Sequence, residues 1–205
     1  MHFSRALSQI SEIRDHLTKV EVYRGFRSLP VALAGGIGLF AAWIEEWILP
    51  AATPLESVAY WTCVAAASAL IGSSEVVIKF IFLDDAFSRR RTRKMAEQFL
   101  PSLLAGAIVT VAVVKAQETA MLAMIPLLPG LWSIIFGLGV FSSRPHLPRA
   151  IGWVGLYFLV AGAVLLWTAG EGGVLPGGKL GLTFGLGQFA AALVLYWNLE
   201  RRDLG

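Results

Sequence analysis

Charged residues are scarce in this sequence. Asp, Glu, Lys and Arg make up 15% of its 205 residues and apolar residues make up 56%, whereas about a quarter of the residues in a soluble domain are charged. This composition excludes an ordinary soluble domain and indicates a protein that faces lipid. The net charge is only +3. We therefore expect no nucleic-acid partner, which would need a basic surface beyond what membrane insertion explains.

Cysteine and histidine are also rare. The single cysteine, Cys63, excludes a disulfide within the chain and a thiolate metal cluster. The three histidines, His2, His16 and His146, all fall outside the long apolar stretches, where none can ligate a haem iron or a buried zinc ion. We therefore expect no metal ion, no cofactor and no histidine general base at bilayer depth.

Long apolar runs account for most of the chain. A helix needs about 20 apolar residues to cross a hydrocarbon core of about 30 Å, and runs near that length recur six times. They are too long and too continuously apolar to be the strands of a barrel. The sequence therefore predicts an all-α polytopic membrane protein, in which residues 29–199 form a six-transmembrane-helix bundle. The spans are expected at about 30–49, 57–78, 99–114, 120–141, 150–168 and 180–199.

Basic residues are distributed unequally between the segments that connect these spans. Lys and Arg favour the cytoplasmic side of a membrane. If the N terminus is inside, 15 of the 17 basic residues fall in cytoplasmic segments, and only Lys115 and Lys179 lie outside. We therefore expect both termini in the cytoplasm, residues 200–205 as a cytoplasmic tail, and a location in the plasma membrane, that is, the inner membrane of a bacterium.

The first 28 residues have a different pattern. Apolar side chains recur every three or four positions, with charged residues between them; they are Phe3, Leu7, Ile10, Ile13, Leu17 and Val20. This periodicity predicts a cytoplasmic amphipathic helix over 1–28 that lies on the inner leaflet or docks on the bundle. A structural anchor and a helix that binds a partner or senses a signal both fit the pattern.

Two adjacent glutamates, Glu45 and Glu46, end the first predicted span. They resemble the start of the EExxxR motif of CAAX-type intramembrane endopeptidases, but Pro50 occupies the arginine position and no later span carries the histidines that complete that site. We therefore expect both acids at the outer interface. One would face water while the other caps a neighbouring helix or pairs with Lys115 or Lys179. The alternative is an outer vestibule that attracts cations.

A second partial motif lies after the second span. LDDAFSRRR at 83–91 resembles the start of the CDP-alcohol phosphatidyltransferase motif, DGxxAR followed after eight residues by Gly-xxx-Asp-xxx-Asp. The downstream positions hold Gln98, Ser102 and Gly106, so the acids needed for a two-metal site are missing. The basic run here is an orientation signal. It also suits anionic lipid headgroups, because each Lys or Arg beside a membrane adds about 1 kcal/mol of attraction; its members are Arg89, Arg90, Arg91, Arg93 and Lys94.

Glu75 lies inside the second predicted span, near its cytoplasmic end. A glutamate at bilayer depth is costly, which makes it a functional candidate. One hypothesis is an ion pair with Lys79, Arg24 or Arg27 that staples the second span to the base of the first. The other is a polar pocket that faces the cytoplasm; its candidate members are Glu75, Arg24, Arg27, Glu97, Gln98 and Gln188.

Small residues are frequent in the predicted spans. Gly181 and Gly185 form a GxxxG motif, which lets two helices approach closely. Such faces can meet within the chain, or they can hold a protein partner or a second copy. Gln188, near the predicted midplane, is either a hydrogen-bonding link between helices or part of a polar path.

Three classes of function remain open. We favour a non-enzymatic accessory, sensory or regulatory component of the membrane. A small transporter or channel would need a polar path near Gln188 and Glu75. An enzyme that modifies lipids would need at least three converging acids or an activated nucleophile.

Overall fold

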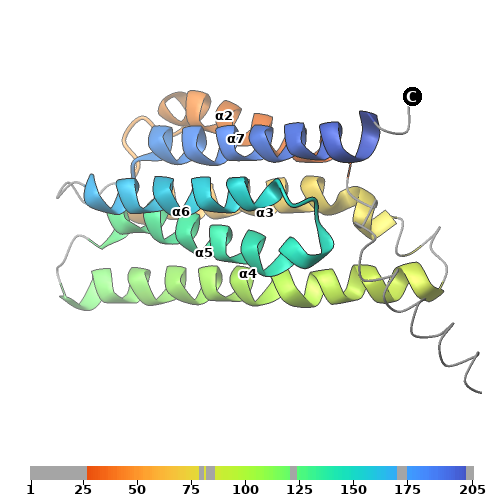
Figure 1. Cartoon of the computed structure of the whole chain (residues 1–205). Coiled ribbons are helices and arrows are strands. Elements are labelled where there is room, and N and C mark those ends of the chain that lie inside the picture. Colours follow the sequence, from red (N-terminus) through yellow and green to blue (C-terminus); the bar gives the residue numbers. More distant parts are fainter. Residues whose placement is uncertain (1–26, 79–80, 82–85, 121–123, 170–174, 202–205) are drawn as a thin grey trace, which may run out of the picture.

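The computed structural model describes residues 27–78, 81, 86–120, 124–169 and 175–201. Within these ranges the chain forms six α-helices and no strand, so the all-helical prediction is confirmed. The helices lie side by side and alternate in direction along the chain (Figure 1). They are α2 (Ser28–Ile48), α3 (Pro54–Ile78), α4 (Ala86–Ala120), α5 (Leu128–Ser143), α6 (Ile151–Trp167) and α7 (Gly177–Leu195), with short turns η2 (Ile125–Leu127), η3 (Arg144–His146) and η4 (Tyr196–Glu200). The predicted amphipathic helix lies almost entirely outside the described residues.

Within the described residues, five helical stretches are long and apolar enough to cross a membrane: Ser28–Ile48, Pro54–Ile78, Ala96–Ala116, Ile125–Ser143 and Gly177–Glu200. This confirms the prediction of several helices with the length and composition of membrane spans. The remaining helix, α6, has 17 residues and is shorter, although it contains no charged side chain.

The start of α3 shows why the chain turns where it does. Pro54 is the first helical residue, where its missing N–H would have no helical partner. The Thr53 backbone N–H and hydroxyl donate to Glu56 Oε2 at 2.7 and 2.9 Å, and the Glu56 N–H donates back to the Thr53 hydroxyl oxygen at 3.3 Å. This reciprocal capping box satisfies backbone donors at the start of the second apolar helix.

Helix α4 is longer than the span predicted within it, about 99–114. It begins at Ala86 and continues for 35 residues, with Pro101 inside it. The added N-terminal part is rich in Arg, Lys, Glu and Gln, which are good helix formers. Arg93 Nε donates to Glu97 Oε1 at 2.7 Å, an i, i+4 pair that supports the helix before the apolar part begins.

Glycines allow the closest helix contacts. A Cβ at Gly35 would lie 3.0 Å from the carbonyl oxygen of Gly185, and a Cβ at Gly181 would lie 2.7 Å from that of Gly38. The GxxxG motif of α7 therefore packs on α2 of the same chain. A second glycine contact joins α5 and α6, where a Cβ at Gly162 would lie 2.8 Å from the carbonyl oxygen of Gly130. Helices approach this closely only where side chains are absent.

Neighbouring helices follow the order α3, α2, α7, α6, α5, α4. Phe158 of α6 is fully buried in the core cluster that also contains Val31, near the start of α2. Its ring lies 4.8 Å from that of Phe136 on α5 and 5.2 Å from that of Phe184 on α7, measured between centroids. A second core cluster, which contains Ala41 of α2, packs around Trp61 of α3, which is 3% exposed. Helices α3 and α4, at the ends of the row, keep broad apolar faces exposed.

Candidate functional site

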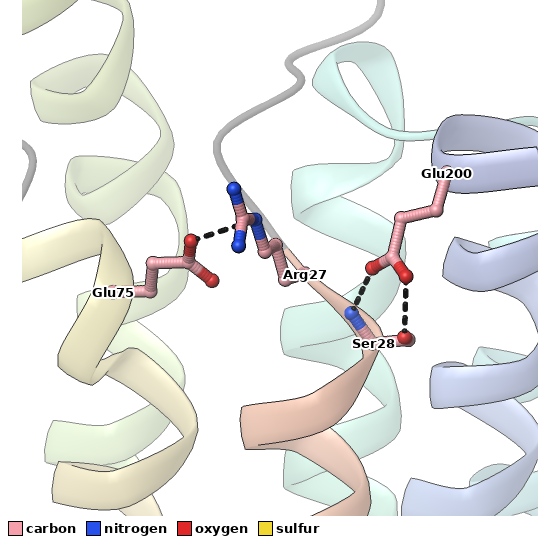
Figure 2. A network of polar contacts seen from close by, with 4 residues as sticks. All are labelled: Arg27, Ser28, Glu75 and Glu200. Atoms are coloured by element: carbon pink, nitrogen blue, oxygen red, sulfur yellow. Dashed lines mark hydrogen bonds and ion pairs between the residues drawn. The ribbon is translucent and has the colours of Figure 1, made fainter. Parts of the chain in front are cut away.

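The start of α2 is tied to α3 and to the turn after α7 by two carboxylates. We call this group the inner clasp (Arg27, Ser28, Glu75 and Glu200), after the membrane side on which the sequence predicts it. Arg27 and Ser28 lie between the two glutamates (Figure 2). Arg27 Nε lies 2.9 Å from Glu75 Oε1, with the arginine side chain 65% exposed and the glutamate 20% exposed. This ion pair joins the bases of α2 and α3, as one of the two hypotheses for Glu75 proposed.

Glu200 supplies the other half of the inner clasp. Its Oε1 accepts the Ser28 backbone N–H at 2.7 Å, and its Oε2 accepts the Ser28 hydroxyl at 3.0 Å. The residue before the helix, Arg27, makes no side-chain capping bond of its own. A carboxylate at this position satisfies an orphan N–H and lies at the positive end of the helix dipole. Glu200 therefore caps a helix that begins 172 residues earlier in the chain.

The sequence analysis did not single out Glu200. The contact between Glu200 and Ser28 could be inferred only by combining two facts. The first is in the sequence: the first and last spans run in opposite directions, so the start of one and the end of the other share a membrane level. The second, that α2 and α7 are direct neighbours, comes only from the packing. Glu200 ends a π-helical turn, η4, whose wider spacing sets the side-chain direction after α7.

Glu45 makes the corresponding link at the opposite end of α2. We call this group the outer clasp (Glu45, Trp61 and Gly177), after the membrane side on which the sequence predicts it. Trp61 Nε1 donates to Glu45 Oε1 at 2.9 Å. The glutamate carboxylate also occupies the space where a side chain at Gly177 would stand, in the first turn of α7. It lies at the positive end of the α7 dipole, where Pro176 provides no side-chain cap.

The two clasps are reciprocal. A carboxylate after the end of α7 serves the start of α2, and a carboxylate near the end of α2 lies at the start of α7. Glu46 differs from Glu45, because its side chain is exposed. The tryptophans on either side of this pair, Trp43 and Trp47, are 68% and 80% exposed. This placement agrees with the alternative in which one acid is exposed and the other caps a neighbouring helix.

The other described members of the predicted polar pocket do not join the inner clasp. Glu97 pairs with Arg93 on its own helix. Gln188 packs against α2, with its Cβ 2.9 Å from where a Cβ of Gly35 would stand. The Gln98 side-chain oxygen is buried and has no hydrogen-bond partner among the described residues. Arg24 lies outside the described residues. Among the described members, the structure pairs only Arg27 with Glu75.

The predicted lipid-binding run lies on the N-terminal part of α4. Arg93 and Lys94 are exposed there, while the side chains of 89–91 are outside the described part of the chain. Within the described ranges, no three His, Cys, Asp or Glu side chains come together in a group that could hold a metal ion.

Comparisons of the chain with protein-family models, curated proteins and solved structures found no match.

Proposed function

We propose that this chain is a six-pass protein of the bacterial inner membrane, with both termini in the cytoplasm, that acts as a non-enzymatic accessory, sensory or regulatory component. Three lines of argument support the proposal. The first is the set of apolar helices, with basic residues concentrated in alternate connecting segments. The second is that α6 has the composition and the terminal tryptophans of a membrane span. The third is that acidic side chains near the helix ends bind other helical segments.

Helix α6 has features of a sixth crossing. Its 17 residues correspond to a length of about 25 Å at about 1.5 Å per residue, a little less than the hydrocarbon core. Trp153 near its start and Trp167 at its end are 73% and 91% exposed. Exposed tryptophans at both ends of an apolar helix are typical of the two membrane interfaces. The even number of crossings also agrees with the bias of basic residues, which favours both termini inside.

The observation that carries the non-enzymatic proposal is the use of the acids near the helix ends. Glu75 binds Arg27, Glu200 binds Ser28, and Glu45 accepts from Trp61. Each of these carboxylates comes from one helical segment and contacts another. Catalysis by a carboxylate needs an acid that is available to a substrate or a metal ion. These three acids instead bind other helical segments. This use favours a non-enzymatic component of the membrane over an enzyme.

Reporter fusions test the proposed topology. A fluorescent protein fused after Gly205 should be bright, because it folds in the cytoplasm, and alkaline phosphatase fused at the same point should be inactive. Phosphatase inserted at 172, between α6 and α7, should be active, because that segment is expected outside. Active phosphatase after Gly205 would contradict an even number of crossings with the N terminus inside.

Crosslinking in native membranes tests the accessory role. We expect the tagged full-length protein to copurify with a second protein in fixed stoichiometry, and Leu7→Asp with Ile10→Asp to abolish this, because both changes put charge on the apolar stripe of the amphipathic helix. Ser8→Asp with Ser11→Asp adds the same charge outside the stripe and should retain the partner. Equal capture by all three proteins, or no stoichiometric partner for the wild type, would count against this role.

A further inference from the structure

A groove runs along the exposed side of α6. It has a volume of about 460 Å³ and is lined by Trp153, Leu156, Tyr157, Val160 and Val164 of α6 and by Thr183 of α7, among others. The Tyr157 hydroxyl donates to the carbonyl oxygen of Thr183 at 3.0 Å, so this hydroxyl already has an acceptor in the wall. Most of the other lining side chains are aliphatic, and the groove therefore suits an apolar occupant.

The dimensions of the groove match one leaflet of a membrane. From Trp153 to Val164 the helix rises about 16 Å, at about 1.5 Å per residue, and half of a hydrocarbon core is about 15 Å. Val160, about two thirds of the way along, and Val164, at the far end, are 56% and 54% exposed. An extended acyl chain of one leaflet therefore fits the groove in length and in chemistry.

Positive charge is concentrated where the groove begins. Arg144 lies over the first turn of α6, because its Nε is 3.3 Å from where a Cβ of Gly152 would stand. Arg149 is exposed just before the same helix, whose N-terminal end adds the positive pole of its dipole. The sequence has no Asp or Glu from 119 to 170. The nearby acid of the turn after α7, Glu200, is bound to Ser28.

We propose that this groove holds one acyl chain of an anionic phospholipid from the leaflet on the Arg144 side, with the headgroup phosphate beside Arg144 and Arg149. Apolar contact alone gives little preference, because other lipids and helices present the same surface to the chain. The two arginines supply the selectivity, and each is expected to favour an anionic headgroup by about fivefold in affinity. The proposal depends on α6 lying in the membrane, but not on which side faces the cytoplasm.

Native mass spectrometry of the purified full-length protein tests this site. The protein in mild detergent is given equal amounts of phosphatidylglycerol and phosphatidylcholine with identical acyl chains. We expect one phosphatidylglycerol to be retained about 25-fold over phosphatidylcholine, about fivefold for each arginine. Arg144→Gln with Arg149→Gln should reduce this preference to less than about twofold. Val160→Trp, which fills the groove, should reduce the retention of both lipids by about fivefold or more, as expected when an occupant is excluded sterically.

Matched variants away from α6 serve as controls. Leu104→Trp adds the same bulk at an exposed position of α4, where the side chain is 55% exposed. Lys115→Gln with Lys179→Gln removes two exposed basic residues near the end of α4 and the start of α7, at the end of the bundle opposite Arg144. Both control proteins should retain phosphatidylglycerol as the wild type does. Equal retention of the two lipids by the wild type would overturn the proposal. So would unchanged retention in Val160→Trp, or an equal loss in the control variants.

A second measurement does not depend on substituted proteins. Phosphatidylglycerol with a photoactivatable diazirine in its acyl chain is added to the wild type in nanodiscs and crosslinked. Residues 156–164 of α6 should be labelled several-fold more than residues 103–111 of α4, because a held chain stays against one surface. Labelling that is equal on both helices would show that acyl chains exchange freely over every exposed face, which overturns the site.

Discussion

Gly181→Ala should lower the free energy of unfolding by about 1–3 kcal/mol, the usual cost of overpacking a close contact. The new Cβ would lie 2.7 Å from the carbonyl oxygen of Gly38 and would collide with the Cβ of Ala42. Backbone atoms cannot rotate away as the end of a long side chain can, so α2 and α7 must move apart. Thermal or denaturant unfolding in detergent, followed by circular dichroism, measures the loss.

Gly36→Ala is the matched control for this substitution. Gly36 lies on α2 beside the same interface, but a Cβ there would meet no atom within 4 Å. Its stability should be unchanged, or raised by up to about 1 kcal/mol, because alanine loses less conformational entropy than glycine in a helix. Equal stability of the Gly181→Ala and Gly36→Ala proteins would show that α2 and α7 do not pack through this glycine face.

Glu200→Ala should lower the free energy of unfolding by about 1–2 kcal/mol, the upper part of the range measured for the loss of a helix cap. The substitution leaves the Ser28 N–H and hydroxyl without their acceptor and removes a link between distant parts of the chain. Glu75→Gln should cost less, about 1 kcal/mol or below, since its partner Arg27 is 65% exposed and exposed ion pairs contribute little.

Glu46→Ala is the control for both acidic substitutions, because the Glu46 side chain is exposed. Its effect should stay within about 0.5 kcal/mol, as for most surface positions. If Glu75→Gln costs more than Glu200→Ala, the ion pair and not the cap is the main link at the base of α2. If neither substitution changes the melting temperature, the inner clasp does not stabilise the bundle.

The outer clasp shows how far sequence reasoning reached for the candidate site. The sequence placed Glu45 and Glu46 together at the end of a span, beside two tryptophans, and proposed that one acid faces water while the other caps a helix. Nothing in the local sequence distinguishes the two acids. The distinction arises because Glu45 points toward α3 and α7, where Trp61 donates to it and Gly177 leaves space for its carboxylate. Adjacent residues on a helix point about 100° apart, so one faces the bundle and its neighbour faces outward.

The pocket proposed around Glu75 shows the opposite outcome. Most of its members were grouped by their predicted membrane level. Level alone does not place side chains on the same side of the bundle, and the main neighbours of α2 are α3 and α7, whereas α4 packs mainly on α5. Glu97 therefore pairs along its own helix with Arg93, and Gln188 faces Gly35 within the contact between α2 and α7.

The sequence by itself determined the all-helical class and the apolar stretches. It also indicated the approximate ends of most helices, but not those of α4 or the start of α5. The length of an apolar run is a local property, and in lipid the backbone of such a run can satisfy its hydrogen bonds by forming a helix. Only the tertiary structure decided which helices are neighbours. Contacts such as Ser28 with Glu200 and Gly181 with Gly38 depend on the rotation of each helix about its axis and on which glycine faces meet. Six helices of similar apolar character have many arrangements of similar burial, so close backbone contact and a few polar links select among them.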